Sequence, residues 1–315
     1  MKPVITAYGE ALWDLLPEGQ VLGGAVLNFT YRVKSLGADA ECISRLGQDE
    51  LGNQAAEKME HLGYDLGFIQ RDENYPTGTV PVSFDEQKNP SYVITPDVAY
   101  DYIDYTPNLK ERVEASDCLC FGSLIQRAPK SRETLYKLIE QFSGKYLLFD
   151  INLRKDCYTA EAVGNSLEKC HIAKLNEDEL FEMKSLVGIS GNSITELARS
   201  CVKKYNLAFC LVTLGDKGLF ASADTGTEVY VPGIAVDLVD PIGAGDACTA
   251  GFIYSLLQEK PLDYACKYAN AIGAAVAETA GATAFVSKQR IEEVLREGEF
   301  LAPHPEFSGK FRTSS

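Results

Sequence analysis

Short apolar segments alternate with helical segments through most of this chain, and this alternation restricts the folds available to it. Each apolar segment has the length of a buried strand and is followed by a stretch with helical periodicity. The clearest of these segments span residues 118–122, 146–150, 172–176 and 208–214. Parallel strands that are connected through helices form a sheet covered on both faces. The sequence therefore predicts an α/β fold, with a doubly wound, mostly parallel sheet and helices on both faces.

Two segments depart from this pattern and predict a small β lid beside the sheet. Residues 77–105 alternate polar and apolar residues around a polar turn at 85–89, which is typical of a hairpin. Residues 10–23 complete the predicted lid, whose apolar face must cover either a ligand site or the same lid of a second subunit. A chain of 315 residues, 45% of them hydrophobic, can bury one large core, so we expect a single domain over 1–315 with a frayed tail after Ala302.

The charge and the cysteine content argue against several classes of protein. A formal charge of −15 disfavours nucleic acid or an anionic membrane as a partner, because either would require a basic face. The start of the chain is too quickly polar for a signal peptide and no apolar run reaches membrane-spanning length, so we expect a cytoplasmic protein. The nine cysteines include no Cys-x-x-Cys pair and are expected to be reduced, with Cys118 and Cys120 on one strand face.

The segment at residues 240–246 is the strongest candidate for a catalytic site. Gly243 and Gly245 leave peptide N–H groups uncovered immediately before a predicted helix at 247–260, which is a typical anion-binding arrangement. Asp246 would lie in the first helical turn, beside that anion site, where a carboxylate can accept a proton. A tight turn with an ordinary helix-terminal Asp explains the same residues, so both interpretations stay open. The segment is neither a dinucleotide fingerprint nor a Walker A loop.

Other polar residues are predicted at the sheet edge where ligands bind in such folds. The polar or glycine-rich stretches that follow predicted strands are residues 150–154, 176–179 and 213–218. Near the start of the chain, Gly23 and Gly24 precede a predicted helix at 25–36 and place Asn28 in its first turn. Taken alone, Asn28 is no more than a polar residue at a helix start, and the nearby Asp14 no more than a turn residue.

The combined motifs resemble the ribokinase-like (PfkB) family of sugar kinases over nearly the whole chain. Six separated motifs occur in the order typical of that family. They are Gly9-Glu10 with Trp13-Asp14, Gly23-Gly24-Ala25 through Asn28, Asp150-x-Asn152-x-Arg154, Asn176-x-x-Glu179, Thr213-Leu214-Gly215, and the segment 240–246. Glu10 and the Asn152-Leu153-Arg154 segment resemble the fructokinase branch more than ribokinase or adenosine kinase.

The resemblance implies an ATP-dependent kinase in which Asp246 takes the proton of a sugar hydroxyl. The backbone N–H groups implied to stabilise the transferred phosphoryl group are those of Gly243, Ala244 and Gly245. The residues implied to bind the sugar are Asp14, Gly24, Asn28 and Arg154. The lid would close over the sugar and act as a clasp between subunits, which implies a homodimer.

The same resemblance implies sites for the nucleotide and for two kinds of cation. The residues implied to bind ATP are Asn176, Thr213, Gly215, Gly218 and Asn270. Glu179 would serve Mg²⁺ through water, and the carbonyl groups of Asp240 and Ile242 would bind a monovalent cation, usually K⁺. These assignments depend on the resemblance and not on residue spacing.

The sequence departs from the family pattern at several positions and leaves alternatives open. Pro241-Ile242 and Cys248 replace the usual residues, which weakens the inferred cation site but leaves Asp246 and both glycines intact. Fructose is the expected sugar, and the alternative is another small sugar or a sugar acid such as 2-keto-3-deoxygluconate. A non-catalytic, sugar-binding descendant of the fold is the alternative from a different class.

Overall fold

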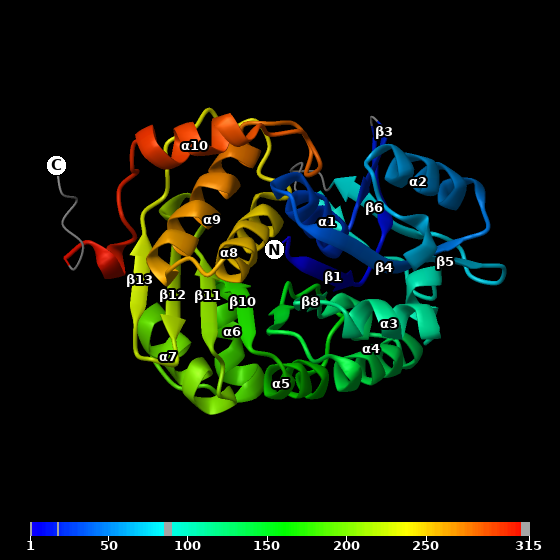
Figure 1. Cartoon of the computed structure of the whole chain (residues 1–315), viewed down its shortest axis with the longest axis horizontal. Helices are drawn as coiled ribbons and strands as arrows, with labels where there is room; N and C mark the ends of the chain where they lie inside the picture. Colours follow the sequence, from blue (N-terminus) through cyan, green and yellow to red (C-terminus); the bar gives the residue numbers. More distant parts are fainter. Residues whose placement is uncertain (1, 18, 85–89, 310–315) are drawn as a thin grey trace.

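A computed structural model describes residues 2–17, 19–84 and 90–309, and its largest element is a central sheet (Figure 1). Within these residues the sheet has nine strands in the order β13-β12-β11-β10-β9-β8-β1-β4-β5. The strands from β11 to β5 are parallel and β12 and β13 are antiparallel, which confirms the predicted, mostly parallel sheet. The bounds are Val4–Tyr8 (β1), Asp39–Gly47 (β4), Ile69–Asp72 (β5), Cys118–Gly122 (β8), Tyr146–Asp150 (β9), Ile172–Asn176 (β10), Phe209–Thr213 (β11), Leu219–Ala223 (β12) and Glu228–Val231 (β13).

Helices cover both faces of this sheet, as the sequence predicts. Figure 1 shows α1, α8 and α9 on one face and α3 to α7 on the other. The helices of the first side are Ala25–Leu36 (α1), Glu50–His61 (α2), Ala244–Leu257 (α8), Leu262–Ala277 (α9) and Lys288–Glu297 (α10). Those of the second side are Pro107–Glu114 (α3), Pro129–Gln141 (α4), Ala160–Lys169 (α5), Glu177–Val187 (α6) and Ile194–Tyr205 (α7). No helix in the described ranges has both the length and the apolar content needed to span a membrane.

Alternate side chains of the inner strands pack into two separate cores, one on each face of the sheet. In β8, Cys118 and Cys120 lie in the core on the side of α1 and α8, whereas Leu119 and Phe121 lie in the opposite core. All nine cysteines are free and buried, and Cys118 and Cys120 share one strand face, as predicted for these two. Short 3₁₀ helices also occur in the described chain, at Leu66–Phe68 (η1), Ala99–Tyr102 (η2), Leu124–Gln126 (η3), Gly215–Lys217 (η4) and Pro305–Phe307 (η5).

The segments predicted to form a lid contribute to a second, smaller sheet. Its described strands follow the order β3-β2-β6-β7. Their bounds are Leu12–Leu16 (β2), Gly19–Gly23 (β3), Gly78–Phe84 (β6) and Pro90–Tyr92 (β7). The predicted turn at 85–89 lies outside the described residues. The predicted range of 77–105 extends too far, because Val98, Tyr100 and Ile103 are buried in the main core. The dimer contact through the lid stays a prediction.

Helix α8 begins and ends three residues earlier than the predicted range of 247–260. Its first turn includes Ala244 and Gly245, which the sequence pattern assigned to the turn before the helix. At the other end, Glu259 adopts a left-handed conformation with φ of 57°, and the N–H of Lys260 donates to the carbonyl of Ser255. This geometry is a helix termination that usually uses glycine, so the sequence placed the end of the helix at the next helix breaker, Pro261, three residues too late.

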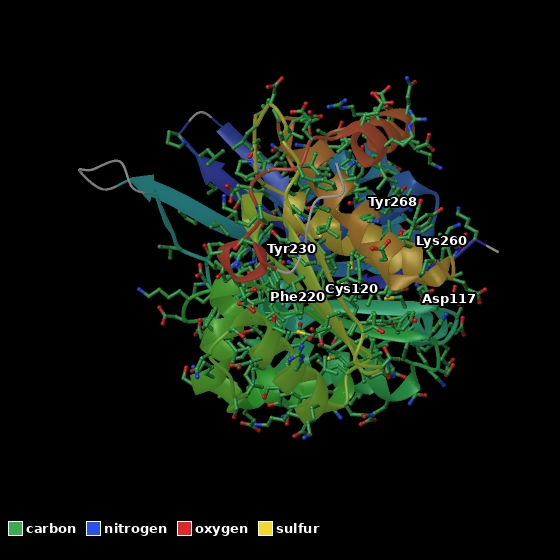
Figure 2. All side chains as sticks on the ribbon, turned by 90° about the vertical axis from the view of Figure 1, so that its left-hand side faces the viewer. Asp117, Cys120, Phe220, Tyr230, Lys260 and Tyr268 are labelled. Carbon is green, nitrogen blue, oxygen red and sulfur yellow. The ribbon has the colours of Figure 1, made fainter. Side chains whose placement is uncertain are left out.

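The C-terminal segment is packed in its described part, and the predicted frayed tail after Ala302 is therefore wrong there. Phe307 is buried and stacks on Tyr230 and Phe220, with ring centroids at 4.2 and 5.2 Å. Figure 2 labels both partners, which lie on β13 and β12 beside the C-terminal turn drawn in red. Glu306 accepts N–H bonds from the first residues of α7. One buried aromatic ring and one helix-capping carboxylate thus anchor a short polar segment.

Candidate active site

The loop before α8 is tied to the loop after α9 through Asp240. Its Oδ1 accepts the N–H of Ile242 and its Oδ2 accepts the N–H of Gly281, both at 3.0 Å. Gly243, which precedes α8, has a φ of 80°, and an added Cβ atom there would lie 2.4 Å from the Cβ atom of Ala282. Only glycine fits this turn without strain, because the φ is positive and the neighbouring loop is in contact. The two loops therefore fix where α8 starts.

The first turn of α8 offers backbone N–H groups to an anion. The first bond of helical type runs from the N–H of Ala247 to the carbonyl of Gly243 at 2.9 Å. The N–H groups of residues 245–246 precede that bond, so they are left for a ligand at the positive end of the helix. The N–H of Ala244, which was predicted to face the phosphoryl group, instead donates to the carbonyl of Pro241 at 3.2 Å.

Asp246 faces Asn28 across the contact between α8 and α1. The Nδ2 of Asn28 donates to the Oδ2 of Asp246 at 2.9 Å. Asp246 lies in the first turn of α8, but no side chain caps the N-terminus of that helix. A helix-capping role therefore does not account for this carboxylate. The Oδ1 of Asn28 is buried and has no hydrogen-bond partner among the described residues, so it can accept a bond from a ligand hydroxyl.

The electrostatic surroundings of Asp246 suit a proton acceptor. Burial and the nearby carboxylate of Asp150 raise the pKa of Asp246 to about 6, against the opposing effects of Lys174, Asn28 and Arg154. A carboxylate with this pKa is ionised at neutral pH and is a stronger base than an ordinary aspartate.

Glycines at the start of α1 allow two acidic side chains to approach the site. Gly24 has a φ of 127°, and a Cβ atom there would lie only 2.3 Å from the backbone carbonyl oxygen of Glu10. The Oε1 of Glu10 accepts the N–H of Ala25 at 2.9 Å, and burial raises the pKa of this carboxyl group. A Cβ atom at Gly23 would lie 3.2 Å from the Oδ2 of Asp14. Side chains at these glycines would push Glu10 and Asp14 away from the start of α1.

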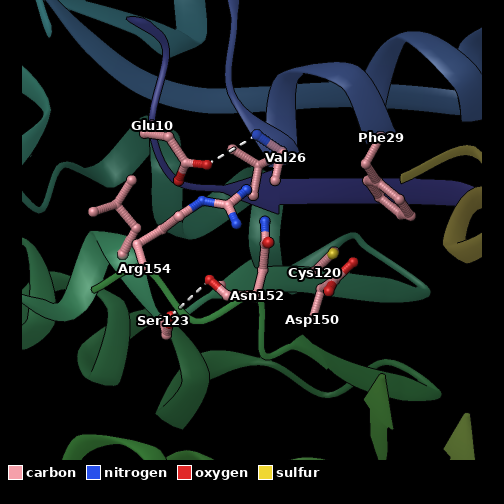
Figure 3. Close-up of a pocket in the computed structure, with 11 residues that line it drawn as sticks. Glu10, Val26, Phe29, Cys120, Ser123, Asp150, Asn152 and Arg154 are labelled. Atoms are coloured by element: carbon pink, nitrogen blue, oxygen red, sulfur yellow. Dashed lines mark hydrogen bonds between the residues drawn. The ribbon is translucent and has the colours of Figure 1, made fainter. Parts of the chain in front are cut away.

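A pocket lies at the carboxyl ends of β1, β8 and β9, next to these residues (Figure 3). Figure 3 shows the guanidinium group of Arg154 extending toward Glu10 and the start of α1, with Phe29 at the other end of the pocket. Asn152 also lines it in a left-handed conformation with φ of 44°, and its carbonyl accepts the hydroxyl of Ser123 at 3.2 Å. Polar groups on one side and an aromatic ring on the other are typical of a small polar ligand site.

The residues predicted to bind the nucleotide come from separate elements. Thr213 ends β11, and its hydroxyl lies 3.4 Å from a β10 carbonyl. Gly215 and Gly218 bound the turn that follows and have φ values of 57° and 92°. The amide of Asn270 in α9 donates to the carbonyl of Pro232 at 2.8 Å, so it holds the loop after β13.

Asn176 and Glu179 form a capping box at the start of α6. The side chain of Asn176 accepts the N–H of Glu179, and the Oε2 of Glu179 accepts the N–H of Asn176 at 2.8 Å. The Oε1 of Glu179 accepts the N–H of Leu153, also at 2.8 Å. Both carboxylate oxygens are therefore used to hold backbone groups. Within the described residues, no cluster of three His, Cys, Asp or Glu side chains could hold a metal ion.

Comparisons with known proteins agree with this geometry. The model of the pfkB family of carbohydrate kinases matches residues 18–289. This chain belongs to the pfkB family. A Pyrococcus horikoshii protein, described as an uncharacterized sugar kinase, is 30% identical over 95% of this chain and 98% of its own. Its crystal structure in complex with ATP has a TM-score of 0.78 at 28% identity and covers 92% of this chain and 99% of that chain.

Two further relatives show a similarity to fructokinases and to the ribokinase-like fold. A fructokinase of Escherichia coli is 28% identical, over 81% of this chain and 85% of its own. The structure of Arabidopsis thaliana ribokinase, in complex with ribose and ATP, has a TM-score of 0.78 at 20% identity and covers 94% of this chain and 99% of that chain. The last likeness shows the ribokinase-like fold alone. As a pfkB carbohydrate kinase, the protein is a phosphotransferase that acts on a sugar hydroxyl.

Two buried residues of this carbohydrate kinase that lie behind Asp246, Lys174 and Thr249, were not predicted, and Asp150, which bonds to both, was predicted only as part of a motif. Lys174 donates to the Oδ1 of Asp150 at 3.1 Å, and the hydroxyl of Thr249 lies 3.0 Å from the Oδ2 of the same carboxylate. A signal was present, because Lys174 interrupts an otherwise apolar strand at Ile172–Asn176. Lysine is almost never buried unless it is paired, so its position in a buried strand indicates a specific partner.

Proposed function

We propose that this kinase transfers the γ-phosphoryl group of MgATP to a hydroxyl of a neutral free sugar, with fructose as the best candidate. The observation that carries the proposal is Asp246, a carboxylate with a pKa of about 6 beside the open N–H groups of α8. In the reaction, the sugar oxygen forms a bond to the γ-phosphorus as the bond to the β-phosphate oxygen breaks. The hydroxyl proton goes to Asp246, and ADP leaves. Gly245 and the helix N-terminus stabilise the charge of the transferred group.

The sugar would lie between the lid and the start of α1. Asn28 fixes one oxygen of Asp246 and offers its buried Oδ1 to a hydroxyl. Asp14 and Arg154 can bond to further hydroxyls, and Gly24 provides the space for this approach. Positioning of this kind accounts for much of the catalysis in phosphoryl transfer.

The nucleotide would bind at the carboxyl ends of β10 and β11. Support for ATP comes from the ATP complex of the P. horikoshii relative. Thr213, Gly215, Gly218 and Asn270 are the proposed contacts. Because both oxygens of Glu179 hold backbone groups, Mg²⁺ would arrive as the MgATP complex and keep ligands from phosphate and water. Glu179 would then position the loops around the phosphates.

The charge of the site favours a neutral substrate. Glu10 and Asp150 line the described pocket and Asp14 and Asp246 lie near it, whereas the cations are Arg154, which lines the pocket, and Lys174, which is paired with Asp150. An anionic substrate would meet this excess of negative charge. A sugar acid remains the second candidate, because the carboxylate of 2-keto-3-deoxygluconate could pair with Arg154.

A substrate panel tests this choice. ATP-dependent ADP release should be fastest with fructose among neutral hexoses and pentoses, and its kcat/KM should exceed that for 2-keto-3-deoxygluconate by at least about tenfold. Arg154→Met should weaken a sugar acid more than fructose if the acid is the true substrate. A higher kcat/KM for the acid in the parent enzyme would contradict the proposed neutral substrate and leave the phosphotransferase assignment in place.

A monovalent cation could bind at the loop before α8. The carbonyl of Pro241 is used by Ala244, whereas those of Asp240 and Ile242 accept no hydrogen bond within the described residues. These two carbonyls therefore fit the proposed K⁺ site, next to the helix start that binds phosphate. Replacing K⁺ with tetramethylammonium at constant ionic strength should lower kcat several-fold. Equal rates in the two buffers would contradict the proposed cation site. The hydrogen bonds of Asp240 would then order the loops without a cation.

A further inference from the structure

A lysine lies buried directly behind the phosphate-binding end of α8. Lys174 belongs to β10 and is only 7% exposed. Its Nζ donates to the Oδ1 of Asp150 at 3.1 Å, and a Cβ atom added at Gly245 would lie 3.6 Å from the same Nζ. The ammonium group therefore lies behind the second residue of α8, on the protein side of the proposed phosphoryl site.

The lysine is held in place by hydrogen bonds that connect three elements. Asp150, at the end of β9, pairs with Lys174 through one oxygen. The hydroxyl of Thr249, which is fully buried in α8, lies 3.0 Å from the other oxygen of Asp150 and 3.0 Å from the carbonyl of Gly245. The position of the ammonium relative to the helix start is thus set by buried, mutually bonded groups.

The lysine carries its positive charge throughout the working pH range. Burial lowers the pKa of Lys174, but the carboxylates of Asp150, Glu179 and Asp246 outweigh burial, so the pKa is raised above its ordinary value. A buried ion pair contributes little to stability compared with apolar packing. Stability alone therefore does not explain a cation here, at the positive end of a helix and beside a carboxylate that accepts a proton.

We propose that Lys174 is a positioning residue for phosphoryl transfer, which places a fixed positive charge behind Gly245 and keeps Asp246 ionised. The charge adds to the helix N-terminus where negative charge of the phosphoryl group must be held. Lys174 touches neither sugar nor nucleotide in this arrangement and acts through the first turn of α8. The inference rests on the proposed function, in which Asp246 is the base.

The pH dependence of kcat/KM separates this role from a structural one. The charged or polar groups that act on Asp246 are Asp150, Lys174, Asn28 and Arg154, and Asp246 in turn acts on the thiol of Cys120. The thiol of Cys120 stays neutral because burial holds its pKa well above the ordinary value. In the parent enzyme the rate should rise with pH through about 6, as Asp246 loses its proton.

Lys174→Met and Asp150→Asn should shift the pH at which kcat/KM rises in opposite directions. Loss of the ammonium should shift it upward by about one pH unit, and loss of the Asp150 carboxylate should shift it downward. At pH 8.5, where Asp246 is ionised in both proteins, Lys174→Met should still lower kcat by at least about tenfold, because the phosphoryl site has lost a charge. Lys174→Arg should keep both properties near those of the parent.

A matched control is Lys34→Met, which breaks the 2.7 Å pair with Glu41 at the far end of α1. It should change the melting temperature without moving the pH profile. If Lys174→Met does not fold, Lys174→Gln decides, because glutamine can bond to Asp150 without a charge. An unmoved profile in a folded Lys174→Met or Lys174→Gln would overturn the role of Lys174. Absence of any rise near pH 6 in the parent would instead refute Asp246 as the base.

Discussion

Asp246→Asn is expected to lower kcat by at least about a hundredfold while the protein stays folded and binds ATP. Asparagine keeps the size of the side chain and an oxygen that can accept the hydrogen bond from the side-chain amide of Asn28. It cannot take the proton of the sugar hydroxyl, so the step that depends on a base is lost. Single-turnover phosphorylation of fructose and a separate ATP-binding measurement would distinguish loss of chemistry from loss of binding.

The same variant should also change the stability of the protein, in a direction that follows from the pKa of Asp246. The folded protein raises the pKa of Asp246 to about 6, so the ionised carboxylate costs stability above that pH. Removing it should raise the melting temperature at pH 8, and the gain should shrink as the pH falls through 6 toward the unfolded pKa. A stability cost for an active-site charge is a common compromise in enzymes. Near-parental kcat in the Asn variant would disprove the catalytic role.

The sequence was sufficient to predict the sheet and the place of the proposed catalytic carboxylate. Buried parallel strands have a clear apolar signature, and their order along the chain is read directly. The choice between a base and a cap at Asp246 could not be made from the sequence. The contact that supports the proposed base is with Asn28, which is 218 residues away in the chain and is reached only when α1 and α8 pack together.

Other features could not be predicted because local pattern and tertiary packing disagree. The segment around Tyr100 alternates like a lid strand, yet it folds into the core as a 3₁₀ turn. Phe307 lies in a polar stretch that resembles a tail, and the aromatic rings of β12 and β13 on which it stacks are distant in the sequence. Lys174 was visible as an exception in an apolar strand, but its partner Asp150 is on a neighbouring strand.

Gly24→Ala is expected to have the largest effect on stability. A φ of 127° is strained for any residue with a Cβ atom, and here that atom would overlap the carbonyl oxygen of Glu10 at 2.3 Å. Because the atom in the way is backbone, relief requires movement of the segment that follows β1 relative to α1. We expect a loss of about 3 kcal/mol or more in the free energy of unfolding, measured by urea denaturation.

The same substitution should also damage sugar binding more than nucleotide binding. Moving the start of α1 displaces Asn28 and the lid strand that carries Asp14, whereas Thr213 lies across the sheet on β11. The KM for sugar should therefore rise at least about tenfold at a temperature where the variant is folded, with a smaller change in the KM for ATP.

Gly164→Ala is the matched control, because nothing lies within 4 Å of a Cβ atom at that position in α5. It should be neutral or stabilising by up to about 1 kcal/mol. Parental stability and KM values in Gly24→Ala would mean that the close approach of Glu10 to α1 does not constrain the site.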